Sequence, residues 1–563
     1  MDGSATSPLL NADDHEEDME ANEQQESSKG GWRSSIYIIG VEAAERFAYY
    51  GMSANLITYL TDVLLEPTAT AAMNVNIWSG VATVLPLLGA FMADSYLGRF
   101  KTIIISSAIY LMGLVMLVLS VSVIPLRFQK VVFFFSLYMV AVGEGGHKPC
   151  IQTFGADQFD EDKPDEKTAK SSFFNWWYFG ICTGNSTALC LVVYIQDNVS
   201  WAIGFGVPAI AMAIALALFL FGWRSYRRQS LTGSPLTRVV QVFVAAARKR
   251  HLSFSDDGHG DCSGEESITL AIDSHSTGRQ TLPRIHQFKF LDKATIIDDL
   301  DLSSKNRNGW RLCTLTQVEE VKLLLRLLPI WFSCLIYGIM FSQGGTFFTK
   351  QGSTMYKRIS SNFSVPPASL QVAIGVVTII GMPIYDLVFV PTARNCTGFP
   401  SGITILQRIG VGIFLSAVAM VIAALVEGRR LKIAREYGLI EKPKETIPMS
   451  IFWLLPQYMM MGASNLFAIV GLQELFYDQM PEGMRSMGSA AYLSVLGAGS
   501  LLSSALISMV QFASSRWGDE WLGENLNLAH LDYYCWLLAG LSGFGLGCFI
   551  LVAKCFIYKK TQC

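Results

Sequence analysis

Residues 41–51 read VEAAERFAYYG, and they place three charged side chains inside an otherwise apolar and aromatic stretch. On a helix, Glu42, Glu45 and Arg46 fall at positions i, i+3 and i+4, and therefore on one face. A charged side chain in a membrane helix costs roughly 2.5–3.5 kcal/mol on insertion scales, and it nearly always faces a bundle interior or a wet cavity. The meaning of this stretch therefore depends on the solvent around it.

The composition of the chain indicates a membrane. Of the 563 residues, 51% are hydrophobic and 16% are charged, whereas a soluble domain carries about 25% charged residues. Apolar runs of about 20 residues recur, which is the length that a helix needs to cross a bilayer. Only helices and closed barrels pair every backbone group in lipid, and these runs are too long for barrel strands. We therefore predict an all-α, multi-pass membrane protein.

The apolar runs predict twelve transmembrane helices in two six-helix bundles. In the first bundle, residues 32–222, we expect spans near 36–60, 77–97, 102–124, 130–150, 174–195 and 201–222. In the second bundle, residues 319–558, we expect spans near 320–344, 368–391, 405–426, 449–475, 487–511 and 533–557. Polar composition predicts that residues 223–318 form a solvated, partly disordered cytosolic linker with basic helical turns at its ends. Residues 1–31 are expected to be a disordered cytosolic tail, and residues 559–563 a second cytosolic tail.

The orientation follows from the basic residues that flank the spans. Those near residues 99–101, 224–228 and 554–560 fall on one side, which predicts that both termini lie in the cytosol. One segment, EGRRLKIAREYGLIEKPKE at 427–445, conflicts with this orientation because it falls on the opposite side despite its basic residues.

The two glutamates of the opening stretch share one guanidinium. Arg46 can neutralise one carboxylate, so the other must take up a proton or wait for another cation. Desolvation and a like-charged neighbour both favour the protonated form of such a group. The alternative is an internal ion pair that only holds helices together. We predict that Glu42, Glu45 and Arg46 form a proton-binding site.

Several motifs resemble one known family. The pattern Glu42-x-x-Glu45-Arg46 followed by FAYYG resembles the ExxER signature of the proton-coupled oligopeptide transporter family, in its plant nitrate/peptide transporter branch. Further resemblances are GAFMADSYLGRFK (89–101), GEGGHKPCIQTFGADQFDE (143–161), FFNWWYFGICTGNSTALCLVVYIQDNV (173–199) and GLQELFYDQMPEGMRSMGSA (471–490). The third of these is weaker, because Cys182 and Asn185 stand where the family has Asn and Ser. The resemblance implies a major-facilitator fold and proton-driven symport by alternating access, with protons as coupling ions and no other cofactor.

Two further roles come from GAFMADSYLGRFK (89–101) and the threonine that follows it. Asp94 and Arg99 border a tight cytosolic turn, where a salt bridge between them would hold one gating state. Thr102 matches the position of a regulatory threonine in a nitrate-carrying member, and Arg99 before it suits a basophilic kinase as a partner. The alternative for Thr102 is a helix cap.

The resemblance also implies substrate-binding residues. It places Lys148 near the proton site and the substrate, although a lysine that snorkels to the interface is the alternative. In family members with a carboxylate on the tenth span, that group engages this lysine and, in peptide carriers, the substrate's amino group. The matching residue here is the neutral Asn465, so we expect Lys148 to lack that partner. Phe341 stands at the position of a nitrate-contacting histidine, and Gln343 and Tyr50 complete the expected lining.

These residues predict a small anionic substrate, either nitrate or a small organic acid such as a plant hormone. A di- or tripeptide–proton symporter and a transporter-like sensor are the alternatives. No zinc-ligand spacing, HExxH or Ser–His–Asp pattern occurs, so we expect no metal site and no enzyme. No basic stripe indicates nucleic acid. The expected location is the plasma membrane or the vacuolar membrane, with the lipid bilayer as a partner.

Overall fold

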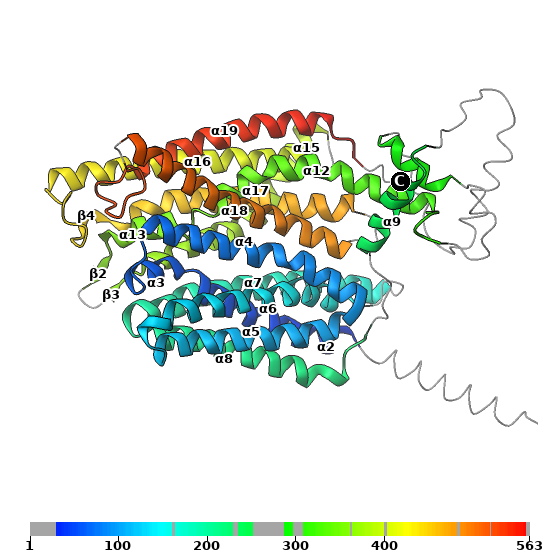
Figure 1. Cartoon of the computed structure of the whole chain (residues 1–563), viewed down its shortest axis with the longest axis horizontal. Coiled ribbons are helices and arrows are strands. Elements are labelled where there is room, and N and C mark those ends of the chain that lie inside the picture. Colours follow the sequence, from blue (N-terminus) through cyan, green and yellow to red (C-terminus); the bar gives the residue numbers. More distant parts are fainter. Residues whose placement is uncertain are drawn as a thin grey trace, which may run out of the picture. The chain divides into compact units, whose positions relative to one another are not determined.

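The computed structural model describes residues 30–159, 164–228, 235–251, 287–296, 308–360, 363–398, 402–480, 485–517 and 520–558. These residues are largely helical (Figure 1) and form two compact units. Unit 1 combines Met1–Leu56 with Leu97–Leu231, and unit 2 combines Ile57–Tyr96 with Thr232–Cys563. The helices of residues 57–96 thus pack with the second half of the chain, and the predicted division at the linker into two six-helix bundles stays a prediction.

Unit 1 is built from five long helices. They are α2 (Gly31–Ser53), α5 (Arg99–Ser122), α6 (Leu126–Ala156), α7 (Pro164–Asn198) and α8 (Trp201–Phe221), the last followed by the turn η2 (Gly222–Arg224). Helix α2 packs along α7 and α8, and α5 packs along α6 and α8. The start of α2 is held by two backbone hydrogen bonds, from Gly30 to the carbonyl of Ser225 at 2.9 Å and from Gly31 to that of Gln158 at 2.7 Å.

Unit 2 begins with elements from early in the chain. These are α3 (Leu56–Asp62), α4 (Thr68–Met92) and the π-helical turn η1 (Ala93–Leu97). Its later helices are α9 (Pro235–Arg248), η3 (Lys289–Thr295), α12 (Leu315–Phe341), α13 (Phe347–Ser353), η4 (Pro367–Gln371), α14 (Val372–Ile384), η5 (Tyr385–Phe389), α15 (Val390–Thr397), α16 (Ile405–Glu436), η6 (Ile451–Leu454), α17 (Leu455–Gln479), α18 (Arg485–Trp517) and α19 (Leu531–Cys555). Two short ladders join β1 (Met355–Tyr356) to β4 (Ile447–Ser450) in parallel and β2 (Arg358–Ser360) to β3 (Phe363–Ser364) in antiparallel.

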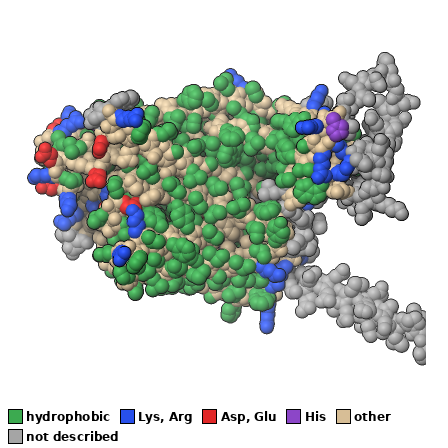
Figure 2. All heavy atoms as spheres, viewed as in Figure 1, with side chains coloured by type: hydrophobic (Ala, Val, Ile, Leu, Met, Phe, Trp, Pro, Cys, Tyr) green, Lys and Arg blue, Asp and Glu red, His purple; other side chains and the backbone are tan. Residues whose placement is uncertain are grey.

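The helices confirm the predicted all-α, multi-pass membrane fold. Among the described residues, eleven helices are long and apolar enough to span a bilayer. Helix α2, the expected first span, is not among these eleven, because it carries too many charged residues. Hydrophobic side chains cover much of the visible face in Figure 2, as expected for a lipid-facing surface. Several helices exceed their predicted spans, and α16 continues ten residues past the expected end at 426 to Glu436.

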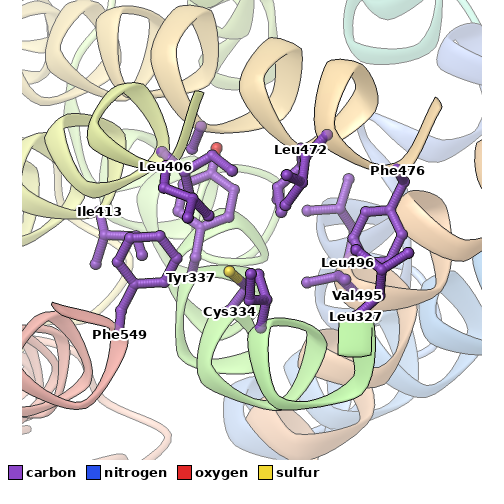
Figure 3. Close-up of a cluster of buried hydrophobic side chains, with 14 of the residues drawn as sticks. Leu327, Cys334, Tyr337, Leu406, Ile413, Leu472, Phe476, Val495, Leu496 and Phe549 are labelled. Carbon is purple, nitrogen blue, oxygen red and sulfur yellow. The ribbon is translucent and has the colours of Figure 1, made fainter. Parts of the chain in front are cut away.

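The hydrophobic core of unit 2 lies where five of its helices meet. Side chains from α12, α16, α17, α18 and α19 converge there, as Figure 3 shows for Cys334, Tyr337, Ile413, Leu472 and Phe549. Small residues let these helices approach closely. A Cβ added at Gly338 on α12 would lie 2.8 Å from the carbonyl oxygen of Val495 on α18.

Part of the predicted linker is packed rather than solvated. The expected basic helical turns are present as α9 and η3, but Val242 and Leu291 are buried against Val318 and Val321 in the first turns of α12. Lys322 of α12 is fully buried beside them and is paired with Glu319 at 2.9 Å. The linker prediction was therefore wrong for these segments, because an amphipathic helix can bury its apolar face against a neighbour.

The segment that conflicted with the predicted orientation is mostly helical. Residues 427–436 extend α16, so their basic side chains do not belong to a loop. Arg430 is fully buried and donates to both carboxylate oxygens of Glu427, at 2.6 and 2.8 Å, and to the side-chain oxygen of Asn527 at 2.8 Å. Gln351 donates to the same carboxylate at 2.7 Å. Every member of this ion pair is hydrogen-bonded, which is the condition for keeping charges out of water.

We predict that Arg430→Met destabilises unit 2 by about 3–5 kcal/mol, because it leaves the Glu427 carboxylate buried without its cation. Thermal unfolding of the detergent-solubilised protein measures the effect. Adding Glu427→Gln to Arg430→Met should recover part of the lost stability, since the stranded charge is then removed. Equal stability of Arg430→Met and wild type would contradict this account of the pair.

Candidate functional site

The structure brings the three charged residues of the opening stretch together inside unit 1. Glu42, Glu45 and Arg46 of α2 are all buried. The Nε atom of Arg46 lies 3.2 Å from Oε1 of Glu42, and its Nη2 atom lies 2.6 Å from Oε2 of Glu45. One guanidinium therefore contacts two carboxylates, as the spacing i, i+3 and i+4 predicted.

Helix α7 lies close against this part of α2. A Cβ added at Gly184 would lie 2.3 Å from the carbonyl oxygen of Ala43 and 3.2 Å from the Cβ of Arg46. No side chain fits between the two backbones at this point. Further along the same helix pair, Gln196 donates to the carbonyl of Gly51 at 2.8 Å. The closeness of α7 thus excludes other groups from one side of the ion pair.

Lys148 has a carboxylate partner on its own helix. Its Nζ atom lies 3.1 Å from Oε1 of Glu144, one turn earlier on α6. We expected Lys148 to lack a carboxylate partner on the tenth span, and we did not predict this partner on α6. The spacing i, i+4 was visible in GEGGHK, and residues so spaced meet on a helix surface. The prediction missed Glu144 because the resemblance pointed to the tenth span.

Tyr49 links the two ion pairs. The guanidinium carbon of Arg46 lies 5.7 Å from the centroid of the Tyr49 ring, and Nζ of Lys148 lies 5.4 Å from the same centroid. Both distances are within the range of cation–π attraction. Tyr50 is half-buried and meets Tyr49 edge to face at 5.4 Å. The carboxylates and cations of α2 and α6 therefore belong to one group of residues, which we call the charge cluster.

The charge cluster contains more acids than bases. Its members are Glu42, Glu45, Arg46, Glu144 and Lys148. Each carboxylate has one oxygen beside a cation. The other oxygen of each, Oε2 of Glu42, Oε1 of Glu45 and Oε2 of Glu144, is buried without a hydrogen-bond partner among the described residues. Oε2 of Glu45 lies beside Nη2 of Arg46 but likewise lacks a hydrogen bond of good geometry. A buried acceptor left without a donor costs about 1–3 kcal/mol. A proton on such an oxygen turns it into a donor, so it no longer needs one.

The predicted substrate residues beyond position 300 lie in unit 2. The side-chain oxygen of Asn465 accepts a hydrogen bond of 2.7 Å from the Tyr337 hydroxyl. Gln343 is buried and donates to the carbonyl of Ile339 at 2.9 Å and to the Ser503 hydroxyl at 3.1 Å. Phe341 packs against the core of its unit. A substrate cavity shared by these side chains and the charge cluster stays a prediction.

The predicted gating residues are Asp94 and Arg99, and the predicted phosphorylation residue is Thr102. Arg99 forms an ion pair with Asp157 at the end of α6. Asp94 belongs to the other compact unit, so its pairing with Arg99 stays a prediction. Thr102 does not cap α5, whose N-cap is Gly98, and its buried hydroxyl donates to the Gly98 carbonyl at 2.9 Å. Phosphorylation would require that hydroxyl to become exposed, and it too stays a prediction.

Comparison with known proteins gives consistent matches. The PTR2 family profile, described as the POT family, matches residues 100–522. Protein NRT1/ PTR FAMILY 5.4 of Arabidopsis thaliana is 53% identical over 535 residues, which cover 95% of this chain and 96% of that protein. Protein NRT1/ PTR FAMILY 5.10 of the same plant is 51% identical over 552 residues, 95% of each. The crystal structure of an auto-inhibited POT family peptide transporter superposes with a TM-score of 0.70 at 24% identity, over 94% of this chain and 99% of that one. The last match shows a shared fold.

We predict that Gly184→Ala lowers the stability of unit 1 by about 1–3 kcal/mol, the usual cost of overpacking. The added methyl group meets backbone rather than a flexible side chain, so α2 and α7 must move apart. Thermal unfolding measures the loss. Gly206→Ala on α8 is the matched control, since its Cβ would meet nothing within 4 Å. An equal response to the two substitutions would contradict the close approach at Gly184.

Proposed function

The chain belongs to the POT family of transporters, and we propose that it is a proton-coupled symporter of a small anionic solute that works by alternating access. The observation that carries the proposal is the buried guanidinium of Arg46, which contacts the carboxylates of both Glu42 and Glu45. Buried ionisable groups in a membrane protein are rare and mark proton or substrate pathways.

The coupling follows from the shared guanidinium. A proton on either glutamate weakens one of the two ion pairs and leaves donors of Arg46 for another acceptor. The proton also makes the charge cluster more positive, which favours an anion beside it. Because the coupling between two ligands is reciprocal, the bound anion raises the affinity for the proton by the same factor. Proton and anion therefore bind and move together.

The neutral residue at position 465 supports an anion over a peptide. A peptide brings an ammonium group, and Asn465 offers it an amide that already accepts a hydrogen bond from Tyr337. An unpaired ion loses several kcal/mol on desolvation. Di- and tripeptides are the second candidate class, favoured by the description of the structural relative as a peptide transporter.

We propose the plasma membrane or the vacuolar membrane as the location, with both termini in the cytosol. The support is the excess of basic residues near positions 99–101, 224–228 and 554–560. The extension of α16 to Glu436 weakens the one conflict with this orientation, since it removes four basic residues from the loop that follows.

The first test of the proposal replaces the shared acids. Glu42→Gln and Glu45→Gln keep the shape of the side chain but remove a titratable group beside Arg46. We expect proton-driven uptake into proteoliposomes to fall to the level of protein-free vesicles. Counterflow at equal pH, which needs no net proton movement, should persist and show that the variants are folded. Glu441→Gln, on an exposed loop, is the control. Concentrative uptake with an unchanged pH profile would place the proton site elsewhere.

The second test concerns the substrate class. In a counterflow assay with the purified protein, we expect nitrate or a small organic acid to exchange and dialanine not to exchange. The reason is the missing carboxylate partner for a peptide ammonium at Asn465. Dialanine exchange as fast as that of the best anion would replace the anion with the peptide as the proposed substrate.

A further inference from the structure

We propose that Glu144 is a second proton-binding site, so that two protons accompany each anion. This inference rests on the proposed function, since it assigns a stoichiometry to the same charge cluster. Some family members pair the lysine that matches Lys148 with an acid on the tenth span, where this chain has the neutral Asn465. Here the acid lies on the same helix as the lysine, with its Oε1 atom 3.1 Å from the ammonium nitrogen.

The surroundings of Glu144 suit a carboxyl group that gains and loses a proton. Its side chain is only 1% exposed, and its Oε2 atom has no hydrogen-bond partner among the described residues. One cation is therefore all that compensates its charge directly. The ionisable groups around it are Glu42, Glu45, Arg46, Tyr49 and Tyr50 of α2, Tyr110 of α5, and His147 and Lys148 of α6.

The charges of the cluster set the number of protons. Three carboxylates and two cations give the fully ionised cluster a net charge of −1. With one proton and one monovalent anion the loaded cluster still carries −1, whereas with two protons and one anion it is neutral. An uncompensated charge in a desolvated site is strongly disfavoured. The loaded form that reorients most readily is therefore the one with two protons.

The two protons have different positions. Arg46 contacts both glutamates of α2, so one proton there still leaves the guanidinium a carboxylate partner. The second proton on Glu144 releases Lys148, whose side chain is 19% exposed, against 6% for Arg46. Lys148 is thus the more accessible cation of the cluster. Protonation of Glu144 therefore turns Lys148 from the partner of a carboxylate into a binding group for the anion.

The first experiment measures stoichiometry with Glu144→Gln and with nitrate as the probe. The variant keeps Glu42 and Glu45 beside Arg46, the first proton site, and with two acids and two cations one proton and one anion suffice for a neutral loaded cluster. Two protons per nitrate move one net charge per cycle, so wild-type accumulation should change tenfold for each 59 mV of membrane potential. Glu144→Gln should accumulate nitrate independently of the potential, which valinomycin and potassium gradients set in proteoliposomes. Glu144→Asp, which keeps a titratable group, and Glu441→Gln should retain the voltage dependence.

The outcomes separate this inference from the proposed function. If the wild type shows no proton-driven nitrate uptake, a second measurement tests the second proton site. That measurement is the carboxylic-acid carbonyl band in infrared spectra of the membrane-embedded protein between high and low pH. We expect the carbonyl band that appears in the wild type at low pH to be weaker in Glu144→Gln and unchanged in Glu441→Gln. Identical spectra, or proton-driven uptake by wild type and Glu144→Gln with the same voltage dependence, would overturn the second proton site.

Discussion

The buried guanidinium of Arg46 is the constraint on which unit 1 depends. A charge inside a membrane protein is tolerated only where an opposite charge compensates it. Glu42 and Glu45 supply that charge from the same helix, so the pairing is present as soon as α2 forms. The close approach of α7 at Gly184 then encloses one side of the ion pair, and Tyr49 connects it to the Lys148 ammonium on α6.

Two buried ion-pair systems in this protein differ in one physical respect. In unit 2, both oxygens of Glu427 accept hydrogen bonds from Arg430, and one of them also accepts from Gln351. In the charge cluster, each carboxylate leaves at least one oxygen without a donor among the described residues. A fully bonded carboxylate is held in its ionised form, whereas a partly bonded one gains less from ionisation. The first arrangement suits a structural ion pair, and the second suits a site that exchanges protons.

The local features of the site could be read from the sequence, and so could the membrane class. Apolar runs of about 20 residues indicated helices in lipid, because no other open structure pairs its backbone there. The spacing of Glu42, Glu45 and Arg46 indicated a shared guanidinium, because a helix places those positions on one face. Glu144 and Lys148 follow the same rule. Lys148 was predicted as a substrate-binding residue, but its pairing with Glu144 was not, because the resemblance pointed to position 465 on the tenth span as the place of its partner.

Helical periodicity determined which side chains share a face, whereas the tertiary structure decided what each face meets. The sequence could not show that residues 57–96 pack with unit 2, that Arg430 reaches Asn527, or that α9 is buried against α12. These contacts join residues far apart in the chain, and an apolar or polar stripe is compatible with many partners. Burial selects among these partners, because a charge or an apolar face leaves water only where a complementary group can contact it.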